Sequence, residues 1–235
     1  MLLTTRSGLI ATGLATCLIS TPIMARDYQG LEESEIDARL SFLDAKLTDI
    51  QTPSKYWQYG WTGFYGVAAT AQLYKAIDED DSDESTKQWV GAVKSAGGLA
   101  MMLLKPLPVV DGWDEYQALP GNTRAEKIAK LAEAEKMLEQ SSWRADERYT
   151  WKPHLITVGV NLLGAGAIAA FGDSDDALGS AALGIAIGEA AIWSQPDQAS
   201  ESWESYQQRF NNGEKSAFNW RIVPGVNNIS LEVTF

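Results

Sequence analysis

Cysteine is almost absent from this chain, and the one that occurs lies in a segment predicted to be removed. Cys17 is the only cysteine among 235 residues. It falls within residues 1–25, where Arg6, an apolar run from Leu9 to Ile19 and a small residue at Ala25 form the pattern of a secretory signal peptide. Cleavage near Ala25 would leave no thiol. This excludes a disulfide framework, a thiol nucleophile and a thiolate metal site.

Histidine and catalytic motifs are equally scarce. His154 is the only histidine, and one imidazole with scattered carboxylates does not supply the ligands of a metal site. The acidic run Asp78–Glu84 lacks the glycine and final glutamate of an EF-hand, which favours a solvated loop over a calcium site. No phosphate-binding loop, nucleophile elbow or H-E-x-x-H motif occurs. The sequence therefore predicts no metal and no cofactor, and it favours a non-enzymatic protein.

Basic residues are too few for a nucleic-acid-binding protein. The net charge is −12, and it becomes −13 when Arg6 is lost with the signal peptide. An excess of negative charge repels nucleic acid and does not draw the protein to an anionic membrane. These features predict an acidic protein of a bacterial-type cell envelope, in the periplasm or associated with the outer membrane. They give no oligomeric state.

Residues 155–193 consist of two apolar arms rich in alanine and glycine, around which the chain is organised. The first arm is uncharged, and the second contains one charge, Glu189. Between them, Gly172 suits a left-handed helix stop, and Asp175 and Asp176 suit the first turn of a second helix. Apolar and more polar or small residues alternate near Val158, which leaves a pair of strands as the alternative. The length of the arms and their alanine content favour a helical hairpin.

Helical periodicity elsewhere predicts a mostly α fold, a bundle around this hairpin. The expected helices cover 31–50, ended by Thr52-Pro53, then 67–77, 89–104, 123–140 with a Thr123–Glu126 capping box, and 197–210. They form one helical domain, 26–215.

The C-terminal residues 216–235 change to a period of two. Ile229, Leu231, Val233 and Phe235 alternate with polar residues, which predicts a short β-hairpin or strand packed on the helical domain. The terminal Phe235 and this alternation resemble the closing strand of outer-membrane β-barrels. The chain lacks the further strands of a barrel, which favours a small edge hairpin.

Four apolar segments raise the question of a membrane. Small residues recur where helices could touch: Gly91, Ser95 and Gly98 in one segment, and Ser180, Gly184 and Gly188 in another. If the N-terminus is exported, however, the acidic loops would face the cytoplasm and the basic connection 105–152 would face out. That inverts the positive-inside rule. We therefore expect the hairpin to be covered within a helical body in water, and we keep an integral membrane protein with four apolar helices as an alternative.

His154, Asn161 and Glu189 are the candidate catalytic residues. His154 and Asn161 share a helix face, and an antiparallel hairpin brings Glu189 to the same end as His154. Burial would raise the pKa of this carboxyl and suit acid–base chemistry, as in a small hydrolase or transferase. The favoured alternative is structural: Glu189 pairs with Lys94 or a tyrosine hydroxyl, and His154 caps or packs.

An aromatic cluster supplies the candidate binding residues Tyr56, Trp57, Trp61, Phe64 and Tyr65, to which we add Lys94. The cluster is either core or a platform for a lipid, a glycan or a membrane interface, and core is favoured. Taken together, the sequence predicts a binding or structural protein whose partner is an apolar ligand, a lipid surface or an envelope protein.

Overall fold

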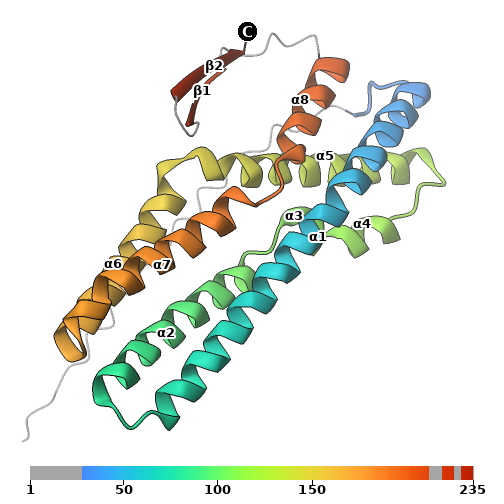
Figure 1. Cartoon of the computed structure of the whole chain (residues 1–235). Coiled ribbons are helices and arrows are strands. Elements are labelled where there is room, and N and C mark those ends of the chain that lie inside the picture. The colour runs from blue at the N-terminus through green and yellow to red at the C-terminus, as the bar shows by residue number, and fades with distance from the viewer. Residues whose placement is uncertain (1–27, 212–218, 225–228, 235) are drawn as a thin grey trace, which may run out of the picture. The chain divides into compact units, whose positions relative to one another are not determined.

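The computed structural model describes residues 28–211, 219–224 and 229–234, and the fold is mostly α as predicted (Figure 1). The helices are α1 (Glu33–Asp78), α2 (Ser82–Leu104), α3 (Pro108–Asp111), α4 (Trp113–Ala118), α5 (Arg124–Asp146), the 3₁₀ turn η1 (Glu147–Tyr149), α6 (Trp151–Phe171), α7 (Ser174–Trp193) and α8 (Gln198–Phe210). The capping box of Thr123 and Glu126 begins α5 as expected.

Helix α1 runs without interruption through Pro53, so the prediction that this proline ends the helix is wrong. Proline removes one backbone hydrogen bond and costs roughly 3 kcal/mol inside a helix. Buried residues on both sides of it, Leu47 and Ile50 before and Ser54 and Trp57 after, fix the helix by tertiary contacts. Packing over the whole helix outweighs a local defect.

The hairpin of residues 155–193 is helical, with α6 and α7 as its arms. Gly172 caps α6 with φ −141°, so the predicted left-handed conformation is wrong. Glycine is needed there for a different reason. A Cβ on Gly172 would lie 3.1 Å from the carbonyl oxygen of Asp83, where α2 passes close by. Asp173 then caps α7, and Asp175 and Asp176 lie in its first turn as expected.

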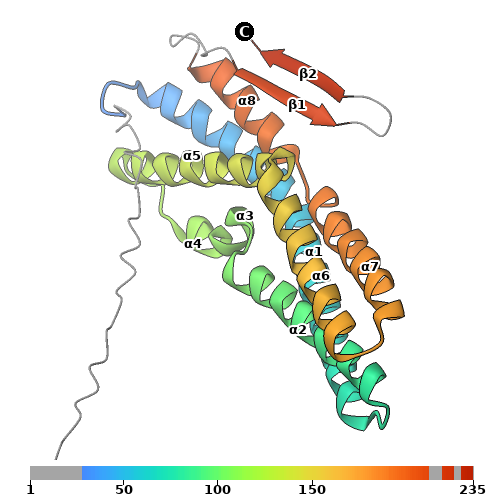
Figure 2. The same cartoon turned by 90° about the vertical axis from the view of Figure 1, so that its left-hand side faces the viewer.

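The first of two regions, here called the head, contains residues 33–56 of α1 together with α3, α4, α5 and α8 (Figure 2). It contains most of the fully buried large side chains, namely Ile36, Leu43, Leu47, Ile50, Val109, Tyr116, Leu131, Leu138 and Tyr206. Trp203 and Tyr206 of α8 stack at 5.7 Å between ring centroids. The head is therefore packed like an ordinary water-soluble domain.

Buried ionisable groups of the head are satisfied by one another. Arg39 donates to Glu35 at 2.7 Å and to the carbonyl oxygen of Phe210 at 2.9 Å, and its guanidinium lies 3.6 Å from Glu135. The hydroxyl of Tyr206 donates to Glu135. Burial, and then the adjacent Glu135 carboxylate, raise the pKa of Tyr206.

This raised pKa predicts a loss of stability in alkali. An unfolded tyrosine ionises near its ordinary pKa of about 10, whereas folded Tyr206 stays protonated. Its contribution to the free energy of unfolding is therefore complete below about pH 10 and declines as the pH rises further. Denaturant titrations at increasing pH should show this decline, and Tyr206→Phe should weaken it. An unchanged pH dependence in the variant would contradict the assignment.

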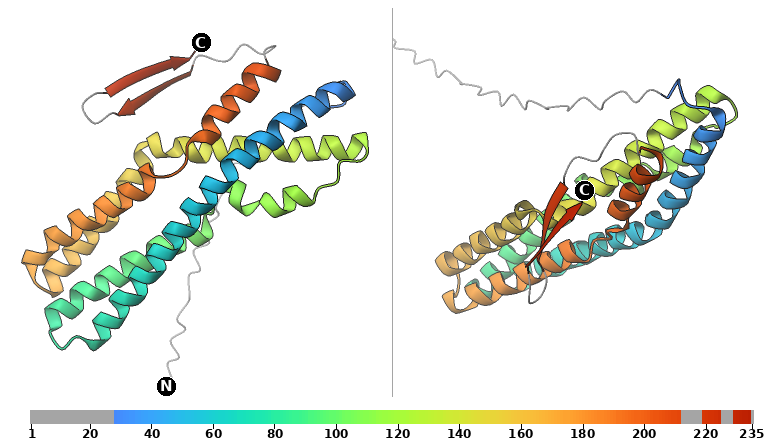
Figure 3. Two further views of the ribbon diagram at one scale, coloured as in Figure 1. Left: turned by 45° about the vertical axis from the view of Figure 1, so that its right-hand side comes forward. Right: turned by 90° about the horizontal axis from the view of Figure 1, so that it is seen from above.

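The second region, the apolar bundle, contains residues 57–78 of α1 together with α2, α6 and α7. Two antiparallel hairpins, α1–α2 and α6–α7, run side by side from the head (Figure 3). Small residues lie where helices touch, as predicted. A Cβ on Gly98 would meet the Tyr65 ring at 2.6 Å, and one on Gly188 would meet Thr157 at 2.4 Å. Ser95 donates to Gln72 at 2.8 Å.

Strands β1 (Asn219–Pro224) and β2 (Ile229–Thr234) pair antiparallel, with Asn219 opposite Thr234 and Pro224 opposite Ile229. The segments 212–218 and 225–228 and the terminal Phe235 lie outside the described residues. The packing of this element on the helical domain therefore stays a prediction.

Candidate functional site

The structure brings His154 and Glu189 together at the head end of the α6–α7 hairpin. His154 Nδ1 lies 2.8 Å from Glu189 Oε2, and Nε2 lies 2.7 Å from the carbonyl oxygen of Arg148. Trp193, one turn after Glu189, donates its indole N–H to the same carboxylate oxygen at 3.1 Å. The two side chains are about one quarter exposed, 26% for His154 and 28% for Glu189. The antiparallel geometry expected from the sequence therefore places them in direct contact.

The hydrogen-bond partners of His154 restrict its chemistry. A carbonyl oxygen only accepts, so Nε2 must carry a proton toward Arg148. The remaining contact shares a single proton between Nδ1 and Glu189. Neither ring nitrogen keeps a free lone pair for a substrate, which a general base needs. In this arrangement the pair links α6, α7 and η1 and does not present a reactive group.

Arg148, which sequence reasoning missed, extends this link into the head. Its side chain is buried and donates to the carbonyl oxygen of Gln195 at 2.7 Å, to the hydroxyl of Tyr149 at 2.8 Å, and to Asp197. Arg148, His154, Glu189 and Trp193, here called the junction cluster, thus connect the apolar bundle to α8. An arginine six positions before the only histidine was the available sequence signal.

Asn161 and Lys94 lie away from the junction cluster. Asn161 donates to the carbonyl oxygen of Thr157 at 2.9 Å and packs against Gly184. Lys94 donates to the Ser180 hydroxyl at 3.0 Å, so it is not the partner of Glu189. Both side chains link neighbouring helices inside the apolar bundle.

The aromatic cluster divides between two faces of α1, because the whole segment is helical. Trp57 and Trp61 turn inward and donate to the Ser194 hydroxyl at 3.2 and 3.0 Å. Tyr56 and Tyr59 turn outward and are 77% and 58% exposed. Tyr65 packs against Gly98, and Phe64, 44% exposed, lies edge-on to Trp61. Part of the cluster is therefore core, as favoured from the sequence, and part is exposed; whether the exposed part acts as a platform stays a prediction.

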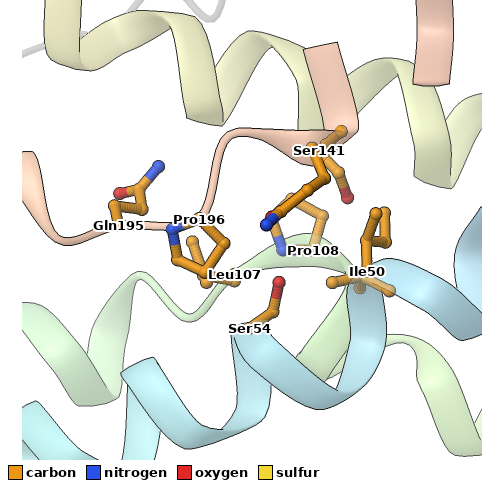
Figure 4. Close-up of a pocket in the computed structure, with 10 residues that line it drawn as sticks. Ile50, Ser54, Leu107, Pro108, Ser141, Gln195 and Pro196 are labelled. Atoms are coloured by element: carbon orange, nitrogen blue, oxygen red, sulfur yellow. The ribbon is translucent and has the colours of Figure 1, made fainter. Parts of the chain in front are cut away.

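A small cavity lies where α1, the α2–α3 connection, α5 and the start of α8 meet (Figure 4). Its lining includes Ile50, Ser54, Leu107, Ser141 and Pro196, and no lining residue is ionisable. The Ser141 hydroxyl is buried there without a hydrogen-bond partner in the structure. This chemistry does not suggest an active site.

The contact between His154 and Glu189 predicts a measurable coupling energy. His154→Ala, Glu189→Ala and the double variant form a thermodynamic cycle whose interaction term we expect to be about 0.5–3 kcal/mol. Thermal unfolding of the purified chain in detergent or buffer measures it. The same cycle for Arg144 and Glu147, an exposed pair at 2.6 Å, should give under about 1 kcal/mol. Additive effects at the junction would contradict its role as a link.

The outer surface of the apolar bundle is uncovered, which corrects the expectation that the hairpin is buried in a helical body. Helix α6 and the segment beginning at Ser174 are long and apolar enough to cross a membrane, and only 17% of the 18-residue apolar stretch in each is buried. Exposed large apolar side chains occur on all four helices: Phe64, Val67, Leu73, Tyr74 and Ile77 on α1; Trp89, Val93, Met101, Leu103 and Leu104 on α2; Leu155, Ile156, Val160, Leu162, Leu163 and Phe171 on α6; Leu178, Leu183 and Trp193 on α7. We call this surface the apolar belt.

Side-chain hydrogen bonds define the two ends of the belt. At the head end, Gln58 of α1 donates to the carbonyl oxygen of Met102 of α2 at 2.5 Å, Trp57 reaches the carbonyl oxygen of Ala191, and His154 meets Glu189. At the far end, here called the tip, the corresponding contacts are Ser85 with the carbonyl oxygen of Ala76, Thr86 with that of Phe171, and Lys87 with Asp176. At 1.5 Å per residue the helices cover about 20–28 Å between these two layers.

Charge is nearly excluded from the belt. Between Lys55 and Lys75 helix α1 has no ionisable side chain except tyrosines, and α6 has none between Lys152 and Asp173 except His154 at the junction. The matching segments of α2 and α7 contain one charge each, Lys94 and Glu189. Exposed Thr70 donates its hydroxyl to the carbonyl oxygen of Gly66 at 2.9 Å, so its polar group is satisfied within its own helix.

Within the described ranges, no three His, Cys, Asp or Glu side chains are placed to hold a metal ion. No protein-family model, curated protein or solved structure matches the chain in sequence or fold.

Proposed function

We propose that this protein is an integral, non-enzymatic component of a cell-envelope membrane. In this proposal the four helices of the apolar bundle span the bilayer and the head lies in water. One observation carries it: the apolar belt surrounds all four helices over about 20–28 Å, close to the hydrocarbon thickness of about 30 Å. A water-soluble monomer rarely exposes so large an apolar surface.

Aromatic residues at the two ends of the belt support this proposal. Exposed Tyr56, Tyr59, Trp151 and Trp193 lie at its head end, and exposed Tyr74 and Trp89 lie toward its tip. Tyrosine and tryptophan concentrate at both membrane–water interfaces because each ring has an apolar body and a polar atom. The junction cluster then fixes the head to the membrane-spanning helices at the boundary. In this proposal its role is structural.

Membrane extraction and cysteine labelling test this proposal. The expressed protein should stay in the membrane pellet after carbonate treatment and should dissolve only in detergent. In a Cys17→Ser background, single cysteines at Ser82 and Ser174, the first residues of α2 and α7 at the tip, should react with an impermeant maleimide from one side of the membrane. One at Gln140 in the head should react from the other side. Release by carbonate, or reaction of all three positions from one side, would refute a four-span protein.

The labelled side also decides between two sequence signals. The predicted signal peptide places the head outside the inner membrane, in the periplasm, whereas the acidic tip loops favour the opposite orientation by the positive-inside rule. Outside labelling of Gln140→Cys would support export of the head. Outside labelling of Ser82→Cys would show that residues 1–25 do not export it. The second candidate function, capture of an apolar ligand or an envelope protein by the belt, predicts a carbonate-soluble complex instead.

A further inference from the structure

Three lysines lie at the head end of the apolar belt, one on each of three helices. Lys55 is one turn before Gln58 on α1, Lys105 caps the end of α2, and Lys152 lies in the first turn of α6. The hydrogen bonds of Gln58 with Met102 and with the backbone N–H of Leu107 place Lys55 and Lys105 in one layer. Trp57 of α1 donates to the carbonyl oxygen of Ala191 on α7, and Glu189 on the same helix contacts His154, two residues after Lys152. These contacts bring Lys152 to the same end of the bundle.

These lysines are free to bind an external anion. All three are exposed, and none forms an ion pair within the described residues. Three carboxylates around the junction cluster already have partners: Glu147 pairs with Arg144, Asp197 with Arg148, and Glu189 with His154. The head end of the belt therefore has unneutralised positive charge, although the whole chain has a net charge of −12.

The opposite end of the belt has the opposite charge. Nine carboxylates gather in the two tip loops and the adjoining helix ends: Asp78, Glu79, Asp80, Asp81, Asp83, Glu84, Asp173, Asp175 and Asp176. Of the two lysines there, Lys87 is already paired with Glu84 and Asp176. An anionic headgroup is thus attracted at one end of the belt and repelled at the other.

We infer that Lys55, Lys105 and Lys152 form a binding surface for anionic phospholipid headgroups in the leaflet next to the head. This inference rests on the proposed membrane-spanning function. Each lysine is the last charge before an apolar segment, so its ammonium lies at phosphate depth while its stem follows the acyl chains. Lys55 also lies 6.0 Å from the ring centroid of exposed Tyr59, which keeps it at the interface. Lysines near an anionic surface contribute about 1 kcal/mol each.

Lipid selectivity measured by electron spin resonance tests this inference. Full-length protein is reconstituted in mixed phosphatidylcholine and phosphatidylglycerol bilayers, and spin-labelled forms of each lipid report the motionally restricted shell around it. We expect the shell to select phosphatidylglycerol about fivefold, the equivalent of about 1 kcal/mol. The selectivity should disappear in Lys55→Gln/Lys105→Gln/Lys152→Gln and should fall in high salt.

The matched control replaces three head lysines, Lys46→Gln/Lys130→Gln/Lys136→Gln, and removes the same charge away from the belt. It should keep the wild-type selectivity. Two results would overturn the lysine surface while leaving the proposed function intact. One is the same phosphatidylglycerol selectivity in Lys55→Gln/Lys105→Gln/Lys152→Gln as in the wild type, and the other is an equal loss of selectivity in the control variant. A wild-type protein with no restricted lipid shell would overturn the proposed function itself.

Discussion

Leu163→Arg should remove the protein from the membrane. Leu163 lies halfway along α6, is 77% exposed and has no charged neighbour on its helix. An arginine at the centre of a membrane-spanning helix costs about 2.5–3.5 kcal/mol on insertion scales, roughly a hundredfold shift in the insertion equilibrium. The fraction of protein in the carbonate-resistant pellet measures this effect. Leu183→Arg, at the matching depth on α7 and 65% exposed, should act in the same way.

The control places the same charge on the head. Gln140→Arg changes an exposed residue of α5, and surface substitutions of this kind alter stability by about 0.5 kcal/mol at most. It should leave the pelleted fraction unchanged. Two results would show that the belt faces water or a removable partner. In the first, Leu163→Arg leaves the pelleted fraction unchanged, as Gln140→Arg does. In the second, Leu163→Arg moves the protein into the soluble fraction and the protein there is fully folded. The integral membrane assignment would then fail.

Alanine should have opposite effects at two glycines of α7. A Cβ on Gly184 would lie 1.8 Å from Asn161 Oδ1, whereas one on Gly179 would meet nothing within 4 Å. Overpacking at Gly184 should cost about 1–3 kcal/mol, more than the gain of up to about 1 kcal/mol that alanine brings to a helix. At Gly179 only the gain applies. Thermal unfolding in detergent should therefore give a lower midpoint for Gly184→Ala and a higher one for Gly179→Ala.

A second substitution separates steric conflict from other causes. Asn161→Ala removes the side chain that Gly184 accommodates, so it should restore part of the stability lost in Gly184→Ala. The double variant thus has a non-additive effect, as expected for residues in contact. Two results would contradict the close approach of α6 and α7. One is a shift of the unfolding midpoint in the same direction for Gly179→Ala and Gly184→Ala, and the other is purely additive changes in stability when Gly184→Ala is combined with Asn161→Ala.

The hairpin and the junction show how much of this molecule local sequence predicts. Uncharged arms of helical length around Gly172 and two aspartates were enough to predict α6 and α7. Their antiparallel arrangement then placed His154 and Glu189 at one end. Helix periodicity and chain reversal are local properties, so both conclusions follow without knowledge of the remaining chain. The third predicted member, Asn161, shares the α7-facing side of α6 with His154 as predicted. It lies seven residues further along the helix, about 10.5 Å at 1.5 Å per residue, so it meets Gly184 and not Glu189.

Pro53 and the aromatic cluster show what only the tertiary structure decided. Proline is a helix breaker in isolation, but contacts made by residues on both sides of it hold α1 in one piece. Trp57 and Tyr56 are neighbours in the chain, and they separate into a buried and an exposed residue because only one side of α1 meets α7.

The apolar belt is the clearest case of this difference. The sequence by itself determined four apolar helical segments, their small-residue contact stripes and the acidic loops between them. It did not determine whether those segments would be covered by other parts of the chain. That depends on where the amphipathic helices pack, and the structure gathers α3, α4, α5 and α8 on the first half of α1. Four helices packed only on one another bury their inward faces and leave their outward faces uncovered, since a bundle of this size has no inner helix.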